Sequence, residues 1–364
     1  MTEEASGVWS GLADLPTDAV ALETEKAGWV ARFANELYGP VPDPPDALKV
    51  EREPCGPAER LLLTLKVGPR EAQFDALLWM PEGSVGPVPL ILALDFLGPF
   101  GLPDVPFPAD PDAIICAPAH LDGERQKLTG AHRGQTGSRW PIEAIHAVGF
   151  GLLISCYGSW VPDDARQWRV RGLNPLIGAD TGAISLWAWA LMRLVDGAAT
   201  LTEVADVFLA GHSRLGKAAL WAAANDPRVA GVFANASGCA GAAPAAHRVG
   251  ETLAQLSERY PHWLRDGAKL PEDLDQHHLL ASVPGAVVLT SARDDLWADP
   301  VGSYRALTSA SGIGDWPAPD DMWLSEGAIR RGRYCHGLRD GRHDLTAEDW
   351  QVALPFFRSS AGIG

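Results

Sequence analysis

The sequence is poor in positive charge and has no long apolar run, and both shortages exclude classes of protein. Its 30 lysines and arginines face 46 aspartates and glutamates, which leaves a formal net charge of −16 at pH 7. A surface this acidic disfavours nonspecific binding to nucleic acid or to an anionic membrane. No stretch approaches the roughly 18 apolar residues that a membrane-spanning helix needs. We therefore expect neither nucleic acid nor a membrane as a partner.

Cysteine is scarce and scattered along the chain. The five cysteines include no Cys-x-x-Cys pair, which argues against a zinc ribbon or a redox dithiol. Their odd number leaves at least one thiol free, and the pattern leaves open whether any of the others form a disulfide. No metal ion and no organic cofactor is expected. The cysteines are Cys55, Cys116, Cys156, Cys239 and Cys335.

The N-terminus lacks the apolar segment of a secretory signal peptide. Residues 1–5 are acidic overall, and no apolar region follows them. Two interpretations stay open, namely a cytoplasmic protein and an exported protein whose leader has been removed.

The chain opens with a helical pattern and a hairpin. Mixed apolar and charged spacing predicts a helix over residues 19–38, which the proline-rich stretch 40–45 ends. Two strands, residues 59–67 and 72–80, flank a Gly68-Pro69 turn, and this pattern predicts an antiparallel hairpin.

The rest of the chain alternates short apolar runs with helical segments. Runs of this kind are typical of strands that are buried on both faces. The runs are residues 88–94, 148–155, 207–210, 229–234 and 286–290, and the helical segments include residues 140–147, 181–203 and 214–225. The alternation predicts an α/β fold, a three-layer αβα sandwich with a mostly parallel central sheet and the antiparallel hairpin at its edge. We expect one domain over residues 1–364, with residues 1–18 as a loosely ordered segment.

Ser213 lies where a predicted strand, residues 207–210, meets a predicted helix, residues 218–224. A sharp strand-to-helix turn exposes a serine hydroxyl at the edge of the sheet, and the helix N-terminus offers N–H groups to a developing oxyanion. The usual pattern is Gly-x-Ser-x-Gly. Here Leu215 takes the place of the second glycine, and Gly216 comes one residue later. The segment predicts a nucleophile, with a serine-containing turn of another α/β protein as the alternative.

A nucleophilic serine needs a histidine base and a carboxylate that fixes the tautomer of that base. In this fold class the chain order is serine, acid, histidine. His343, in a loop ahead of a final helix over residues 347–358, is the last histidine of the chain. The acid should follow the strand 286–291, where Asp294, Asp295 and Asp299 are near equals. Asp299 precedes Pro300 and is the expected cap of the next helix, so we discount it.

Two cations follow the serine directly. Lys217 lies four residues after Ser213, so both side chains can face one pocket. Arg214 could bind a carboxylate or assist an oxyanion. The alternative is that both are solvated side chains at the start of a helix. The N-terminal end of a helix is an unfavourable place for cations, which favours a functional role.

Three motifs together resemble the glucuronoyl esterases of carbohydrate esterase family 15. The motifs lie at residues 211–217, 294–300 and 342–346, and supporting segments lie at residues 139–143, 235–239, 249–252, 260–263 and 275–278. The resemblance runs from about residue 29 to the C-terminus. It implies an α/β-hydrolase that cleaves the ester between lignin-type alcohols and the (4-O-methyl-)glucuronate of glucuronoxylan.

The resemblance also implies roles for particular residues. Ser213 would be the nucleophile, His343 the base and Arg214 an oxyanion stabiliser, and the uronate would contact Lys217, Glu251 and Trp297. Many members carry a glutamate as the acid at a position that is Ala236 here, which cannot serve. Others place the acid two residues before the matching tryptophan. That position is Asp295, which we choose over Asp294.

The chain departs from the family at two further places. Residues 95–100 replace an Asn-Phe-x-Gly-Asn-His segment near the expected site, which puts the choice of leaving group in doubt. His212 stands where members commonly have a cysteine, so a disulfide through that cysteine is absent. Alternatives to the glucuronoyl esterase are an acetylxylan or general carboxylesterase and a catalytically silent carbohydrate-binding relative. We expect a monomer that acts on carbohydrate.

Overall fold

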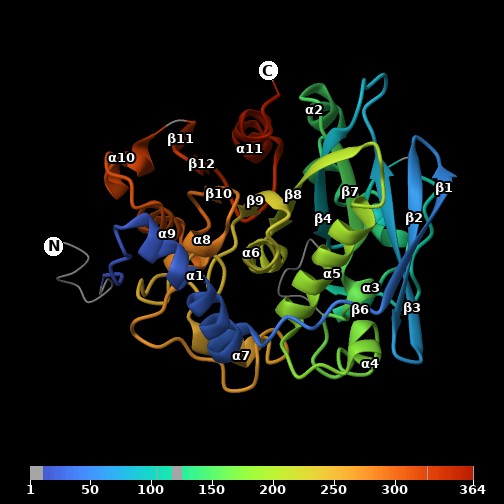
Figure 1. Ribbon diagram of the computed structural model, residues 1–364, viewed down its shortest axis with the longest axis horizontal. Coiled ribbons are helices and arrows are strands. Elements are labelled where there is room, and N and C mark those ends of the chain that lie inside the picture. The colour runs from blue at the N-terminus through green and yellow to red at the C-terminus, as the bar shows by residue number, and fades with distance from the viewer. Residues whose placement is uncertain (1–10, 104, 117–124, 326, 364) are drawn as a thin grey trace.

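A ten-stranded mixed sheet forms the centre of the computed structural model, which describes residues 11–103, 105–116, 125–325 and 327–363 (Figure 1). Its strand order is β1-β2-β3-β7-β4-β8-β9-β10-β12-β11, and β5 and β6 form a separate two-stranded sheet. The strands are β1 (Ala47–Cys55), β2 (Ala58–Val67), β3 (Arg70–Trp79), β4 (Val88–Asp95), β5 (Ile114–Cys116), β6 (Arg125–Lys127), β7 (Gly151–Cys156), β8 (Val204–His212), β9 (Val229–Asn235), β10 (Ala286–Ala292), β11 (Ala328–Arg331) and β12 (Tyr334–Arg339).

Helices connect most of the strands. The α-helices are α1 (Ala19–Phe33), α2 (Ile142–Ala147), α3 (Tyr157–Trp160), α4 (Leu173–Ile177), α5 (Ala183–Ala198), α6 (Arg214–Asn225), α7 (Leu253–Arg259), α8 (Gln276–Ser282), α9 (Pro300–Ser311), α10 (Pro319–Leu324) and α11 (Ala347–Ser360). Short π or 3-10 turns are η1 (Ala34–Tyr38), η2 (Gly98–Gly101), η3 (Gly130–His132), η4 (Gly137–Arg139) and η5 (Leu296–Ala298).

The middle of the sheet is parallel and its two edges are antiparallel. Strands β7, β4, β8, β9, β10 and β12 run parallel to one another, whereas β1 and β3 each pair antiparallel with β2. Strand β3 joins the hairpin to β7, and β11 closes the opposite edge against β12, both in antiparallel fashion. Parallel strands put their carboxyl ends at one edge, which is where open α/β sheets bind ligands.

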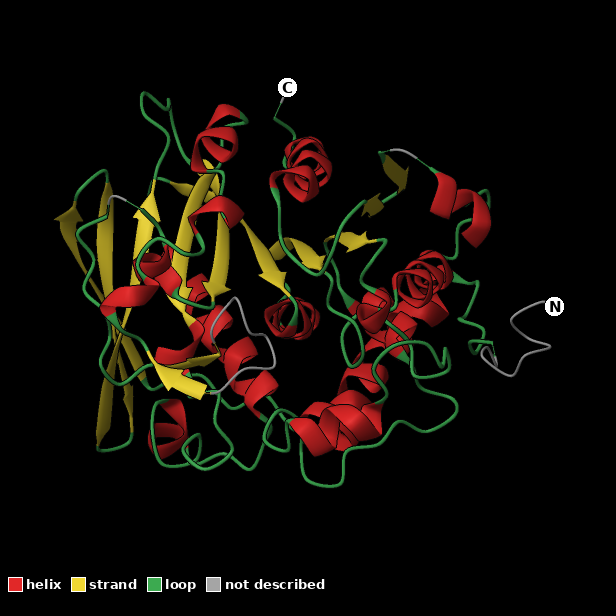
Figure 2. Cartoon of the chain, turned by 180° about the vertical axis from the view of Figure 1, so that it is seen from behind, coloured by secondary structure: helices red, strands yellow, loops and turns green. Residues whose placement is uncertain are grey.

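Alternate residues of each central strand enter different cores. On β4, Leu90, Leu92 and Leu94 pack with α5 and α6 on one face, while Ile91 and Ala93 pack with α2 and α11 on the other. Figure 2 shows these helices on the two sides of the sheet. Burial on both faces explains why the central strands read as continuous apolar runs rather than alternating ones. The layered α/β-hydrolase fold that the sequence predicted is confirmed.

The antiparallel edge is larger than predicted. The hairpin expected at residues 59–67 and 72–80 is present as β2 and β3, but β1 lies outside it and forms the true edge. Most side chains of β1 are exposed, and four of its nine residues are charged, so the strand carried no apolar signal. The expectation of a loose segment over residues 1–18 falls mainly on residues 1–10, which lie outside the described residues.

The five cysteines all lie in the described part of the chain. Each is a buried thiol, and no disulfide joins them. Among the described helices, none combines the length and apolar character of a membrane crossing.

Buried neutral histidines make the fold sensitive to acid. Burial lowers the pKa of His336 to about 3, and of His277 also to about 3. The unfolded chain binds these protons below about pH 6.5, whereas the folded chain does not, so stability falls as the pH drops below that value. We expect His336→Phe to recover about 2–3 kcal/mol of the unfolding free energy that wild type loses between pH 7.5 and 4.5. Denaturant unfolding at both pH values measures this, and an unchanged pH dependence would contradict it.

Candidate active site

Ser213 occupies a strained turn between a strand and a helix. Strand β8 ends at His212 and α6 begins at Arg214, and Ser213 between them has φ 57° and ψ −125°. A positive φ at a non-glycine residue is costly and is held only where the surroundings enforce it. The Ser213 N–H donates to the carbonyl oxygen of Asn235 on β9 at 2.9 Å, which fixes the turn to the neighbouring strand.

Two glycines make room for this turn. A Cβ on Gly211 would overlap the backbone of Leu215, and a Cβ on Gly216 would lie 3.0 Å from the carbonyl oxygen of Gly211 and 3.1 Å from Cβ of Ser237. The glycine that comes one residue late in the motif therefore still serves the close approach of helix and strand.

The seven site residues named from the sequence line one cavity of about 240 Å³ at the carboxyl edge of the sheet. The structure brings together Ser213, Arg214, Lys217, Glu251, Asp295, Trp297 and His343. Six further residues complete the lining, namely Ala236, Ser237, Gly238, Tyr260, Trp263 and Ala298. Residues from six separate segments of the chain thus face one space.

Asp295 is the carboxylate that meets His343. Its Oδ2 accepts a hydrogen bond from Nδ1 of His343 at 2.5 Å, and its Oδ1 accepts from the N–H of Ala298 at 3.3 Å. Asp294 is exposed, and Asp299 accepts from the N–H of Gly302 and thereby caps α9, as the sequence predicted. Since Nδ1 donates to Asp295, Nε2 of a neutral His343 carries the lone pair that a base needs.

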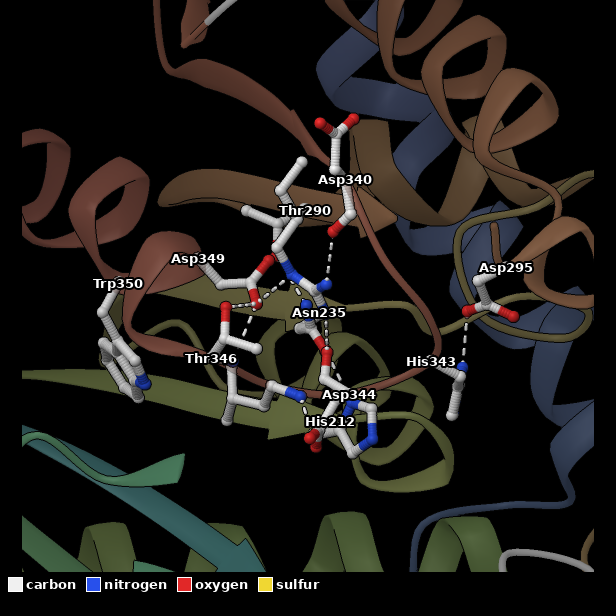
Figure 3. A network of polar contacts seen from close by, with 12 residues as sticks. His212, Asn235, Thr290, Asp295, Asp340, His343, Asp344, Thr346, Asp349 and Trp350 are labelled. Carbon is white, nitrogen blue, oxygen red and sulfur yellow. Dashed lines mark hydrogen bonds and ion pairs between the residues drawn. The ribbon is translucent and has the colours of Figure 1, made fainter. Parts of the chain in front are cut away.

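Arg339 at the end of β12 holds the loop that carries His343. Its Nη2 donates to the carbonyl oxygens of Arg342 and Asp344, the two residues that flank His343, at 3.2 and 2.5 Å. Its Nε donates to Asp349 at 2.8 Å, on the first turn of α11. Figure 3 shows Asp344 and Asp349 in this network, with His343 and Asp295 beside it. Arg339 therefore fixes the loop through its backbone, while the side chain of His343 faces the cavity.

Arg214 is buried and paired, not solvated. The side chain is 2% exposed, and Nη1 donates to Oδ2 of Asp163, which is fully buried. Burial works against the charge of Arg214, but its neighbours, with the Asp163 carboxylate the strongest of them, together outweigh burial and raise the pKa of Arg214 above its usual value. The guanidinium also lies over the ring of Trp263, with Cζ 4.4 Å from the ring centroid.

Lys217 is buried in the wall of the cavity. Nζ donates to the carbonyl oxygens of Ser237 and Cys239 at 2.6 and 2.5 Å. Burial lowers the pKa of Lys217, and the nearby Glu251 carboxylate acts in the opposite direction. An ammonium group has three donors, so these two carbonyls leave one N–H for a further acceptor. The alternative of two solvated cations at the start of the helix is wrong.

The rim of the cavity is aromatic. Trp297 is 46% exposed, and its carbonyl oxygen accepts from the N–H of Glu251 at 3.0 Å. Tyr260 and Trp263 stack in parallel with their ring centroids 3.7 Å apart. No role was assigned to these two rings or to Asp163 from the sequence. Asp163 had only a weak signal, which is its position shortly after the carboxyl end of a parallel strand.

Of the two departures from the family pattern, His212 lies in the elbow itself, and residues 95–100 lie beside it, with the ring of Phe96 6.0 Å from that of His212. His212 donates from Nδ1 to Oδ1 of Asn235 at 2.5 Å, and its ring lies 4.7 Å from that of His343. Burial, followed by the charge of His343, lowers the pKa of His212 well below its usual value, so His212 stays neutral. Asp95 is buried and accepts hydrogen bonds from the indole of Trp140 and the hydroxyl of Thr136. It thereby ties the end of β4 to the residues on either side of η4.

Within the described residues, no cluster of three or more His, Cys, Asp or Glu side chains is arranged to hold a metal ion. The chemistry available at the cavity is that of a hydroxyl, an imidazole–carboxylate pair and buried cations. A strained strand-to-helix turn at the carboxyl edge of a parallel sheet, in this layered fold, defines a hydrolase of the α/β-hydrolase class.

Comparison with known proteins places the chain within that class. It belongs to carbohydrate esterase family 15, the glucuronoyl esterases, and is a carboxylic ester hydrolase. The family model "Glucuronyl esterase, fungi" matches residues 175–316. Carbohydrate esterase MZ0003, from an unknown prokaryotic organism, is 31% identical, over 89% of this chain and 81% of the relative. The 4-O-methyl-glucuronoyl methylesterase of Schizophyllum commune is 24% identical, over 82% and 69%.

Solved structures agree with this assignment. A glucuronoyl esterase from Solibacter usitatus superposes with a TM-score of 0.83 at 29% identity and covers 98% of this chain and 99% of its own. A promiscuous family 15 esterase from a marine bacterial metagenome superposes with a TM-score of 0.80 at 26% identity, over 96% and 97%. The family resemblance seen in the sequence is confirmed.

Proposed function

We propose that this enzyme hydrolyses the ester between (4-O-methyl-)glucuronate of glucuronoxylan and a lignin-type alcohol. The observation that carries the proposal is the placement of Ser213 and the His343–Asp295 pair in one cavity with Lys217 and Glu251. A cation and a carboxylate next to an exposed tryptophan suit the hydroxyl groups and the apolar face of a sugar ring. The relatives named 4-O-methyl-glucuronoyl methylesterases support the same substrate class.

In this mechanism His343 takes the proton of Ser213 as the serine oxygen attacks the ester carbonyl. Arg214 and the N–H groups at the start of α6 stabilise the oxyanion, and Asp295 stabilises the imidazolium. His343 then gives its proton to the departing alcohol, which leaves a glucuronoyl ester on Ser213. A water molecule, deprotonated by His343, cleaves that ester and releases glucuronate, and the proton returns to Ser213. The chain's own side chains supply each proton transfer.

Specificity would come from Lys217, Glu251 and Trp297. The uronate carboxyl is esterified in the substrate and carries no charge, so Lys217 and Glu251 would bind ring hydroxyls rather than a carboxylate. Trp297 would pack on the sugar ring. Recognition of this kind separates uronate esters from small acyl esters, which present no ring hydroxyls.

An ester panel tests the proposal. Methyl glucuronate, methyl galacturonate and p-nitrophenyl acetate are hydrolysed with purified enzyme, and kcat/KM is compared. We expect the glucuronate ester to be the best substrate. A preference for the acetate would favour a general or acetylxylan-type esterase, and binding of xylan without turnover of any ester would favour a silent relative.

Replacing Lys217 with methionine should selectively impair uronate esters. The methionine keeps the buried stem but removes the charged donor, and a hydrogen bond to a charged group contributes about 1.5–3 kcal/mol. We expect kcat/KM for methyl glucuronate to fall about 10- to 100-fold and that for p-nitrophenyl acetate to change far less. Lys66→Ala, an exposed lysine on β2, is the control. An equal loss on both esters would remove the proposed role.

A further inference from the structure

We propose that Asp163 is a positioning residue that holds the Arg214 guanidinium in place to stabilise the oxyanion. The inference rests on the proposed function, because it deepens the role given to Arg214 there. Asp163 does not line the cavity. It acts through the side chain that does.

The Asp163 carboxylate is fully buried, and among the described residues it accepts hydrogen bonds from the side chains of Tyr157, Arg214, His262 and Trp263. Oδ2 accepts from Nη1 of Arg214 and from the hydroxyl of Tyr157, the latter at 2.9 Å. Oδ1 accepts from Nε2 of His262 and from Nε1 of Trp263, both at 2.9 Å. An ionised carboxylate can accept all four of these hydrogen bonds, provided His262 carries its proton on Nε2.

The four donors come from distant parts of the chain and meet at one point. Tyr157 follows β7, Arg214 opens α6, and His262 and Trp263 follow α7. A residue that joins three segments around one carboxylate restricts each of them. Since Arg214 comes directly after Ser213, this anchor fixes the guanidinium relative to the serine.

The aromatic surroundings of Arg214 depend on the same carboxylate. Cζ of Arg214 lies 4.4 Å from the ring centroid of Trp263 and 5.4 Å from those of Tyr260 and Phe96. The indole N–H of Trp263 donates to Asp163, so one carboxylate orients both the cation and the ring on which it lies. Donors held before the reaction stabilise developing charge without having to reorganise, which is the condition for efficient oxyanion stabilisation.

Charge neutralisation gives a second reason for this arrangement. The Arg214 guanidinium is only 2% exposed and needs a counter-ion. If a bound substrate supplied that negative charge, Arg214 would stabilise the ground state of the substrate and not only the transition state. With Asp163 as a permanent counter-ion, Arg214 need not attract an anionic ligand such as the glucuronate product. The guanidinium is then available for the charge that appears only in the transition state.

Replacing Asp163 with asparagine tests whether its charge positions Arg214 or whether its side chain only fills space. Asp163→Asn keeps the shape but places an NH2 group against donors, and it removes the negative charge. Removal of one oxyanion donor typically lowers kcat about 10²- to 10³-fold. We expect Asp163→Asn to lower kcat about 10- to 100-fold, because the donor is displaced rather than lost, with KM changed less than about threefold.

A double-mutant cycle decides whether Asp163 acts through Arg214. Asp163→Asn, Arg214→Gln and the double variant are compared, and kcat is expressed per active site titrated with a fluorophosphonate. We expect Asp163→Asn to have little further effect in the Arg214→Gln background, since a positioning residue has no effect without the group it positions. Equal losses of kcat in both backgrounds, or a wild-type kcat in Asp163→Asn, would overturn the proposal.

Two further variants protect the test against a folding defect. Trp263→Phe removes one donor to the carboxylate but keeps an aromatic ring, and we expect a smaller loss of kcat that also vanishes in the Arg214→Gln background. Asp226→Asn alters another buried carboxylate that pairs with an arginine, at the end of α6 away from Ser213, so it reports the general effect of such a change. It should lower the melting temperature while kcat per titrated site stays within about threefold of wild type.

The cycle is run with both methyl glucuronate and p-nitrophenyl acetate. Oxyanion stabilisation is common to all esters, so the coupling between Asp163 and Arg214 should appear with either substrate. If the enzyme hydrolyses only the acetate, the proposed substrate is wrong, but the acetate cycle still decides the role of Asp163. Absence of coupling with an ester that is turned over would refute the positioning role alone.

Discussion

Replacing Ser213 with alanine is expected to lower kcat by about 10⁵- to 10⁶-fold on every ester the enzyme hydrolyses, while the fold survives. The hydroxyl is the attacking group in the proposed mechanism, and neighbouring groups cannot form the acyl-enzyme without it. Alanine already occupies a left-handed conformation elsewhere in this protein, at Ala236 with φ 46°, so the turn accommodates the change. Initial rates on the ester panel, with circular dichroism as the check on folding, measure the effect.

Labelling provides the control for this result. A fluorophosphonate should modify wild type stoichiometrically and leave Ser213→Ala unlabelled. Retained turnover in the alanine variant, or labelling at another serine that abolishes activity, would mean that Ser213 is not the nucleophile.

Replacing Asp295 with asparagine is the second large effect that we expect. Asparagine can present its NH2 group to Nδ1 of His343, which favours the wrong imidazole tautomer, and loss of the carboxylate charge leaves the imidazolium unsupported. By comparison with acid replacement in serine triads, kcat should fall about 10⁴-fold. The loss should be smaller at high pH, where hydroxide can replace the general base.

Asp294→Asn is the matched control, because it makes the same chemical change one residue away. Asp294 is exposed, and we expect its variant to retain kcat within about threefold. A far larger loss in Asp294→Asn than in Asp295→Asn would assign the acid to the other residue.

The central part of the fold was predictable from the sequence because burial on both faces leaves a plain signal. Strands β4, β7, β8, β9 and β10 each appeared as short apolar runs, and α5, α6 and α11 appeared between or after them. The edges were not predictable in the same way. Strand β1 is held by backbone pairing to β2, and its exposed Glu51, Arg52 and Glu53 look like a loop. Strand β12 combines a cysteine, a histidine and a glycine in six residues, so it lacks a strand pattern although it is buried.

The seven candidate site residues were predictable because their motifs are local, but the choice among them was not. Asp294, Asp295 and Asp299 could not be separated by spacing alone, and the resemblance to a family decided between them. The structure adds the reason, since Asp295 is the one of the three whose carboxylate forms a hydrogen bond with His343. Asp163 was missed because its partners are distant in the chain, as His262 lies 99 residues away. Such a cluster has no signature in a sequence read segment by segment.

The order of strands in the sheet determines how far apart the segments that carry Ser213 and His343 leave it. Ser213 follows β8 and His343 follows β12, with β9 and β10 between them. Neighbouring strands are about 4.8 Å apart, so the two strand ends are separated by roughly 14 Å, far beyond the reach of a hydrogen bond. The loop after β12 must therefore bend back across two strands to deliver its histidine. Arg339 holds this loop in its bent conformation. The distance between His343 and Ser213 is therefore set by the loop rather than by the spacing of the strands.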